Sequence, residues 1–168
     1  MLIPTALLAS IVAVIIGGLI LWSNPARAVN RVVFACSLHI AAWLGCLHIT
    51  IIVPPGEGLF WLRWSCTIGG GLPLSFWIVK ESIAANFDDF GLNWIVRRWG
   101  WIAAPAILMA IPFTGMFIPA HSTSSNRVFG WGYYGYMWSL LGLYSYMFYD
   151  AYRSGELYRD STSGGRRK

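Results

Sequence analysis

Residues 2–22 have the sequence LIPTALLASIVAVIIGGLILW, a run of 21 positions without a charged side chain. An α-helix rises 1.5 Å per residue, so about 20 apolar residues cross the hydrocarbon core of a bilayer. A backbone that faces lipid must satisfy its own hydrogen bonds, which an α-helix does. The run therefore predicts a membrane-spanning helix.

Four further apolar runs follow, at residues 32–53, 59–79, 99–118 and 129–150. The overall composition agrees with them, since 57% of the residues are apolar and 11% are charged, where a soluble domain has about a quarter charged residues. We expect an all-α, polytopic membrane helix bundle of five transmembrane helices. It would occupy residues 1–152 and be followed by a basic, polar cytoplasmic tail at 153–168.

Basic residues are concentrated on one side of the predicted spans. Ten of the 12 Lys and Arg residues fall there, and only Arg63 and Arg127 fall on the other side. Loops rich in Lys and Arg stay in the cytoplasm, so we expect the N-terminus outside and the C-terminus inside, in the inner (plasma) membrane. The bases are scattered over span ends, where they can meet anionic headgroups, which argues against nucleic-acid binding.

The first run has a second interpretation, as a removable secretory signal. Ala26-Arg27-Ala28 resembles a signal-peptidase site. However, no basic residue precedes the run, and the run is longer than the apolar core of a typical signal peptide. We therefore expect this segment to be retained as a span.

The third span contains Gly69-Gly70-Gly71-Leu72-Pro73 near its middle. Glycine costs about 1 kcal/mol and proline about 3 kcal/mol in a helix interior. Neighbouring helices can satisfy the freed carbonyl groups, so we expect a tolerated kink. The functional alternative is a hinge formed by Gly69, Gly70, Gly71 and Pro73.

The second span has one polar face, on which His39 lies. Its members are Cys36, His39, Trp43, Cys46 and Thr50, at steps of three and four residues. Buried polar groups need partners, so this face predicts a hydrogen-bonded packing seam. The functional alternative makes His39 an axial ligand of haem or (bacterio)chlorophyll.

The outer ends of the second and third spans carry a possible ligand site. Arg63 lies between Trp61 and Trp64, and its side chain could simply extend to the headgroups. Alternatively, Trp61, Arg63, Trp64 and His48 bind a ligand at the mouth of the bundle. His48 lies nine positions after His39, on the opposite side of its helix, and could approach His121 in an outer loop.

Few residues are suited to catalysis. Acidic residues are scarce, and no Gly-rich phosphate loop occurs. No carboxylate lies deep in a span, and this absence also weakens the hypothesis of an ion-coupled transporter. The many Trp and Tyr residues of the fifth span fit interfacial belts. We expect no enzymatic activity and no resident metal, and lipid, haem or chlorophyll as the possible bound molecules.

Three short stretches carry a family resemblance: NPARAVNRVVFACSLHIAAW at 24–43, LFWLRWS at 59–65 and GLPLSFWI at 71–78. In this order they resemble the N-terminal seven-helix membrane region of sensor histidine kinases, over its first five helices. The matching positions are Asn24, Pro25, Asn30, Arg31, Trp43, Phe60, Trp61, Arg63, Ser65, Leu72 and Pro73. The resemblance implies an outside N-terminus and a sensory role.

The sequence departs from that family after the fifth span. The family continues into two more helices and cytoplasmic signalling domains, whereas this sequence ends in GGRRK. Kinase activity is therefore not implied. We expect either a truncated sensor region or a stand-alone relative that acts as a signalling input module without catalytic activity. Its partners would be the bilayer and a cytoplasmic signalling domain. The alternative is a non-catalytic accessory subunit of a respiratory or photosynthetic complex, which binds partner helices, lipids or pigments.

Overall fold

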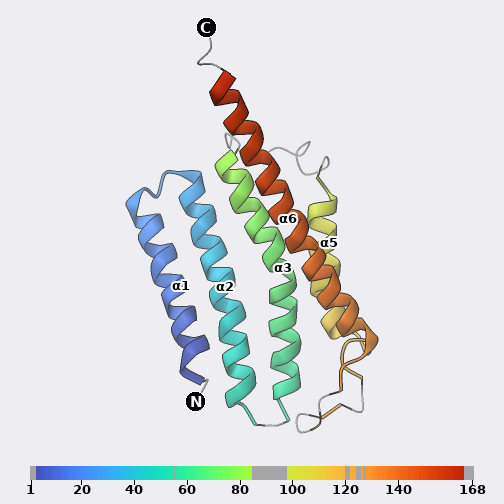
Figure 1. The fold of residues 1–168 in the computed structure, drawn as a ribbon. Helices are drawn as coiled ribbons and strands as arrows, with labels where there is room; N and C mark the ends of the chain where they lie inside the picture. The colour runs from blue at the N-terminus through green and yellow to red at the C-terminus, as the bar shows by residue number, and fades with distance from the viewer. Residues whose placement is uncertain are drawn as a thin grey trace.

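The structure, a computed structural model, describes residues 3–54, 56–84, 98–119, 122, 123, 126 and 128–164. These residues form five α-helices and one 3₁₀ turn, with no β-strand among them (Figure 1). The all-α prediction is therefore confirmed. The elements are α1 (Ile3–Ser23), α2 (Ala28–Ile52), α3 (Gly58–Ala84), α5 (Gly100–Ala110), η2 (Ile111–Phe113) and α6 (Trp131–Gly164).

The helices alternate in direction, so α1 begins at one end of the bundle and α6 ends beyond the other (Figure 1). Helix α2 packs between α1 and α3, and α3 also contacts α5 and α6. The central position of α3 means that its side chains form interfaces with three neighbouring helices.

Small residues bring α1 and α2 close together. A Cβ atom built on Gly17 would lie only 2.5 Å from Cβ of Ser37. The Ser10 hydroxyl donates a hydrogen bond of 2.9 Å to the Ala41 carbonyl. Small side chains that allow close backbone approach, together with interhelical hydrogen bonds, are the usual means by which apolar helices associate in lipid.

The turn between α1 and α2 is held by Asn30, one of the residues of the family resemblance. Its side-chain amide donates to the carbonyl oxygens of Ile20 and Asn24, each at 3.0 Å. Asn30 is buried. Its bond to Ile20 satisfies a carbonyl in the last turn of α1, and its bond to Asn24 holds the turn that follows.

The fourth apolar run does not form one helix, in contrast to the expectation of a span over 99–118. Helix α5 ends at Ala110, and η2 contains Pro112, which has no N–H to donate. At Thr114 the backbone turns to an extended conformation, with φ −84° and ψ 152°. Pro105, by contrast, lies within α5.

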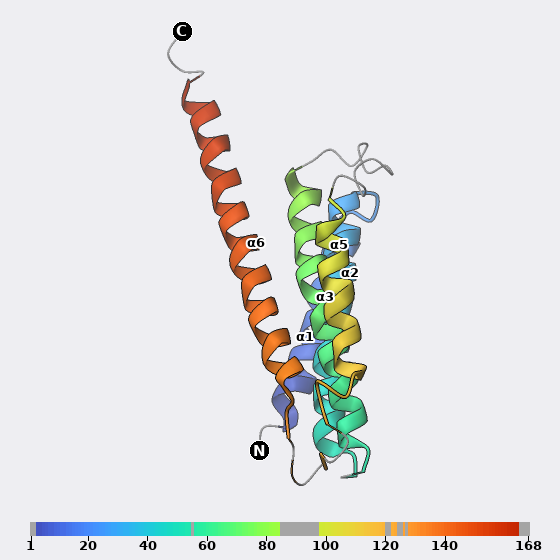
Figure 2. The same cartoon turned by 90° about the vertical axis from the view of Figure 1, so that its right-hand side faces the viewer.

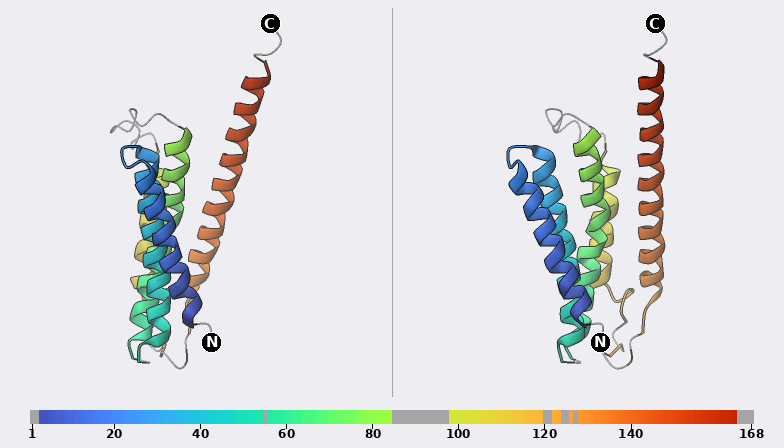
Figure 3. Two further views of the ribbon diagram at one scale, coloured as in Figure 1. Left: turned by 90° about the vertical axis from the view of Figure 1, so that its left-hand side faces the viewer. Right: turned by 60° about the vertical axis from the view of Figure 1, so that its left-hand side comes forward.

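Helix α6 is longer than the run that predicted it and continues through residues 153–164, which we expected to be a polar tail. It approaches the other helices near its N-terminal end and diverges from them toward its C-terminal end (Figures 2 and 3). The main core lies where they converge. Its buried members are Leu108, Phe117, Ile118 and Tyr136.

Two of the described helices are long and apolar enough to cross a membrane, Thr5–Ser23 and Ala28–Ile52, with mean hydropathy 2.4 and 1.9. Both are largely exposed in the bundle, since only 6% and 11% of their apolar windows are buried. Helix α5 is too short for this criterion. Helix α6 is rich in Trp and Tyr, which favour the membrane interface. A five-span arrangement stays a prediction.

Candidate functional site

The glycine run of α3 lies against two other helices. A Cβ atom on Gly69 would lie 3.0 Å from Nε1 of Trp43 in α2, and one on Gly70 would lie 3.1 Å from the backbone carbonyl carbon of Leu108 in α5. The missing side chains therefore make room for neighbours. Helix α3 is continuous through this segment and contains Pro73, so the predicted hinge is helical here and stays a prediction.

His39 of α2 bridges the two sides of the glycine run. Its Nδ1 lies 2.6 Å from the Ser75 hydroxyl oxygen, and its Nε2 lies 2.8 Å from the Ile68 carbonyl oxygen. A Cβ atom on Gly71 would lie 2.9 Å from Cε1 of this imidazole. Gly71 thus admits the ring, and the ring connects α2 to residues on either side of Gly69-Gly70-Gly71-Leu72-Pro73.

The partners of His39 define what its ring nitrogens can do. A carbonyl oxygen only accepts, so Nε2 carries a hydrogen and donates to Ile68. In the neutral ring Nδ1 then accepts from Ser75. A haem or chlorophyll ligand needs a ring nitrogen that can bind the metal, so ligation by His39 would require one of these two bonds to break.

Arg63 faces the segment that follows η2. Its Nη2 donates to the Ile118 carbonyl at 3.3 Å, and its Nε is buried without a partner among the described residues. Trp64 instead packs edge-on against Phe113, with ring centroids 5.3 Å apart. Trp61 forms a similar edge contact with Phe60 at 5.6 Å. Arg63 is therefore hydrogen-bonded within the bundle, at the end where α3 begins.

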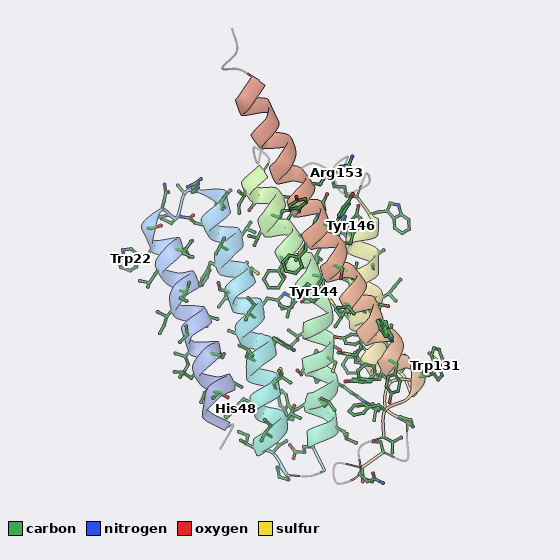
Figure 4. All side chains as sticks on the ribbon, viewed as in Figure 1. Trp22, His48, Trp131, Tyr144, Tyr146 and Arg153 are labelled. Carbon is green, nitrogen blue, oxygen red and sulfur yellow. The ribbon has the colours of Figure 1, made fainter. Side chains whose placement is uncertain are left out.

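His48 lies near the end of α2, where α1 begins (Figure 4). It is half-buried, and its Nδ1 has no partner within the described part of the chain. His121 lies outside the described residues, so the structure does not test its approach to His48. Within the described ranges, no group of three or more His, Cys, Asp or Glu side chains could hold a metal ion.

A groove of about 570 Å³ lies between α2, α3 and α6, and we call it the α2–α3–α6 groove. Its walls are almost entirely carbon, and Figure 4 shows Tyr144 on the side of α6 toward α3. Apolar pockets of about 300–1,000 Å³ with few polar groups are typical ligand sites. The aromatic side chains that line the groove are Trp43, Phe76, Phe129, Tyr133, Tyr136 and Tyr144.

Two hydroxyl groups of this groove, from the first halves of α3 and α6, differ in their partners. The Tyr136 hydroxyl donates to the Cys66 carbonyl at 2.5 Å, which joins α6 to α3. Ser65 is 1% exposed, and its hydroxyl has no partner among the described residues. A buried polar group without a partner is uncommon and costs about 1–3 kcal/mol. Ser65 therefore carries a buried hydroxyl in this groove that a ligand could satisfy.

Four charged side chains meet at the opposite end of the bundle, and we call them the charge cluster: Lys80, Glu81, Arg98 and Asp150. Lys80 pairs with Glu81 at 3.2 Å and also with Asp150 of α6. Arg98, just before α5, pairs with the second Glu81 oxygen. The Glu81 side chain is 8% exposed. The cluster has no net charge and connects α3, the start of α5 and α6.

Aromatic rings lie beside the charge cluster. Trp77 of α3 stacks on Trp101 of α5, with centroids 5.4 Å apart and planes 6° from parallel. Trp101 also contacts Tyr146 of α6 at 5.4 Å. The Arg98 guanidinium lies 5.7 Å from the centre of the Trp77 ring, a favourable cation–π distance. The same three elements are therefore joined by both ion pairs and rings.

In the sequence, the members of the charge cluster served only to predict which ends of the spans face the cytoplasm. Lys80, Glu81, Arg98 and Asp150 all lie at ends of apolar runs on the side predicted to be cytoplasmic. That shared position was a signal that they could meet. Tyr133 and Tyr136 are among the aromatic residues of the fifth span, and they line the α2–α3–α6 groove.

Comparisons of the chain with protein-family models, with curated proteins and with solved structures found no match. The resemblance to sensor histidine kinases stays an expectation.

Proposed function

We propose that the chain is a non-catalytic membrane input module. Five segments would cross the plasma membrane, with the N-terminus outside and the C-terminus inside. The fourth of them would be α5 and η2 with the residues that follow. The packing of α6 would report the binding of a ligand, or the state of the bilayer, to a partner in the cytosol. The observation that carries the proposal is the asymmetric attachment of α6 to the other helices.

Helix α6 is packed tightly near its start, where Tyr136 is 3% exposed in the main core and is hydrogen-bonded to Cys66. Farther along, α6 contacts α3 through the Lys80–Asp150 ion pair and α5 through the Trp101–Tyr146 ring contact. Beyond these contacts the helix continues past the bundle (Figure 2). Such a helix can adopt two packings that differ at its inner end. A ligand can shift their populations only if it binds one packing more tightly.

The ends of the bundle support membrane placement. Trp22 at one end is 88% exposed and Trp131 at the other is 72% exposed, and both rings point away from the bundle (Figure 4). Exposed Trp side chains favour the headgroup zone on either side of a bilayer. Large apolar side chains are also exposed along α1, including Leu8 and Leu19. Lipid would cover them.

An accessory subunit of a larger membrane complex is the second candidate. It is favoured by exposed apolar side chains on α6 that the α2–α3–α6 groove does not use, such as Trp138, Leu141 and Phe148. Partner helices would cover this face. Stoichiometric co-purification with other subunits, or a visible absorption band that His39→Ala abolishes, would favour this candidate over an input module.

The Asp150→Asn variant tests the role of α6. The Lys80 and Asp150 side chains are 20% and 33% exposed, so their pair contributes at most about 1 kcal/mol, and its loss should change the ratio of the two packings about fivefold. Spin labels at Ile83 of α3 and Ala151 of α6, on a background with the native cysteines replaced, should then report longer and broader inner-end distances.

The controls are a second label pair and a second variant. Labels at Phe60 and Tyr134, near the outer ends of α3 and α6, should give unchanged distances in Asp150→Asn. Arg153→Gln, at an exposed position of α6, should change neither pair. An inner distance that Asp150→Asn leaves unchanged would contradict the proposed movement of α6.

A further inference from the structure

We propose that the α2–α3–α6 groove binds one chain-like lipid molecule that carries a hydrogen-bonding oxygen. The oxygen would lie at Ser65, and the chain would extend along α3 toward Phe76. This inference rests on the membrane placement proposed above and names the ligand class of the input module.

The dimensions of the groove favour a single chain. Its lining residues on α3 extend from Leu62 to Phe76, about 21 Å at 1.5 Å per residue. The hydrocarbon core of a bilayer is about 30 Å thick, so the groove is longer than one leaflet of that core. Spread over about 21 Å, a volume of 570 Å³ has a mean cross-section of about 27 Å².

A helix is too wide for this space. An α-helix with side chains has a diameter of at least about 10 Å, and thus a cross-section of roughly 79 Å², nearly three times that of the groove. A partner helix, or the α6 helix of a second copy, would therefore enter the groove only if α6 moved outward. A flexible hydrocarbon chain requires no such movement.

The walls of the groove suit an apolar chain. They are formed by aromatic rings and aliphatic side chains from all three helices, including Trp43, Leu72 and Leu140. Inside a bilayer the apolar chain is already away from water, so the hydrophobic effect does not favour its binding. The favourable binding free energy comes from close packing of the chain against these side chains. The rings of Phe76 and Tyr144, whose centroids lie 6.2 Å apart, would pack against the part of the ligand chain that is farthest from Ser65.

Ser65 supplies the specificity for an oxygen. Its hydroxyl can donate one hydrogen bond and accept others, and it is buried without a partner among the described residues. The neighbouring polar group, the Tyr136 hydroxyl, already donates to Cys66. A ligand hydroxyl or carbonyl at Ser65 would satisfy the unpaired group, which a plain hydrocarbon cannot do.

The test uses a photoreactive probe with the full chain in lipid nanodiscs. The probe is a long-chain fatty alcohol with a diazirine in its chain, and its comparison is the diazirine alkane without the hydroxyl. Labelled peptides are identified by mass spectrometry. We expect the alcohol to label α3 and α6 at the groove. Ser65→Ala should lower labelling by the alcohol about fivefold and leave labelling by the alkane unchanged.

Two tryptophan variants on α6 provide the matched control. Met137 lines the groove and is 46% exposed, whereas Leu141 is 56% exposed and does not line it. Met137→Trp should fill the groove and lower labelling roughly tenfold, and Leu141→Trp should leave it unchanged. Both positions are partly exposed, so neither variant disturbs the buried core. Circular dichroism checks that each variant is folded.

Equal labelling of the wild type and Met137→Trp would overturn the proposal, as would alcohol labelling that does not depend on Ser65. A photoreactive amino acid placed at Met137 that cross-links to a second copy, or to another protein, would overturn it in favour of a helix as the occupant. The spin-label distances in Asp150→Asn distinguish the two failures. If they change as expected while groove labelling fails, only the lipid ligand is wrong.

Discussion

Gly130→Ala should destabilise the bundle by about 3 kcal/mol, at the upper end of the range for overpacking. A Cβ atom at this position would lie 2.1 Å from the backbone oxygen of Met116. Backbone atoms cannot relieve the contact by rotation of a side chain. The Gly130 N–H also donates to the Phe117 carbonyl at 3.0 Å. The substitution therefore pushes the start of α6 away from the segment that follows η2.

The measurement is the free energy of unfolding in mixed detergent micelles, followed by circular dichroism. Gly135→Ala is the matched control, because a Cβ atom there would meet nothing within 4 Å. Alanine in a helix interior is favoured over glycine by about 0.5–1 kcal/mol, so this variant should be as stable as the wild type or slightly more stable. Equal stability of the two variants would show that α6 does not begin against Met116.

Glu81→Gln should cost about 2 kcal/mol. The substitution keeps the shape of the side chain but leaves a net positive charge in the charge cluster, where Glu81 pairs with both Lys80 and Arg98. Breaking a fully buried pair costs about 3–5 kcal/mol. The Lys80 and Arg98 side chains are 20% and 40% exposed, so solvent lowers this cost.

Glu57→Gln is the control for the charge change. Glu57 is exposed in the turn before α3, and surface charges of this kind contribute little. We expect a change of under about 0.5 kcal/mol in the same unfolding measurement. A Glu81→Gln effect no larger than that of Glu57→Gln would mean that the charge cluster does not stabilise the junction of α3, α5 and α6.

Much of the helical layout could be predicted from the apolar runs. The boundaries of α1 and α2 differ from the predicted ones by at most four residues. The break after Ala110 could not be predicted, because Pro105 lies within α5 whereas Pro112 lies in η2. The two prolines differ in their tertiary surroundings, because the segment after Pro112 leaves the helix and buries Phe117 and Ile118 in the core.

The site was less accessible to sequence reasoning. Periodicity placed His39 on the polar face of its helix, and there it bonds to Ser75 and Ile68. The α2–α3–α6 groove depends on the angle at which α6 leaves the bundle, and no local pattern encodes that angle. The charge cluster likewise depends on which end of each helix meets its neighbours.

The side of the membrane on which each end of the chain lies tests the central claim most directly. Tags at the two termini, labelled with a membrane-impermeant reagent in intact cells and again after permeabilisation, report their location. Five spans predict that the N-terminal tag is labelled in intact cells and that the C-terminal tag is labelled only after permeabilisation. Labelling of both tags under the same condition would contradict an odd number of crossings, and with it the proposed transmission through α6.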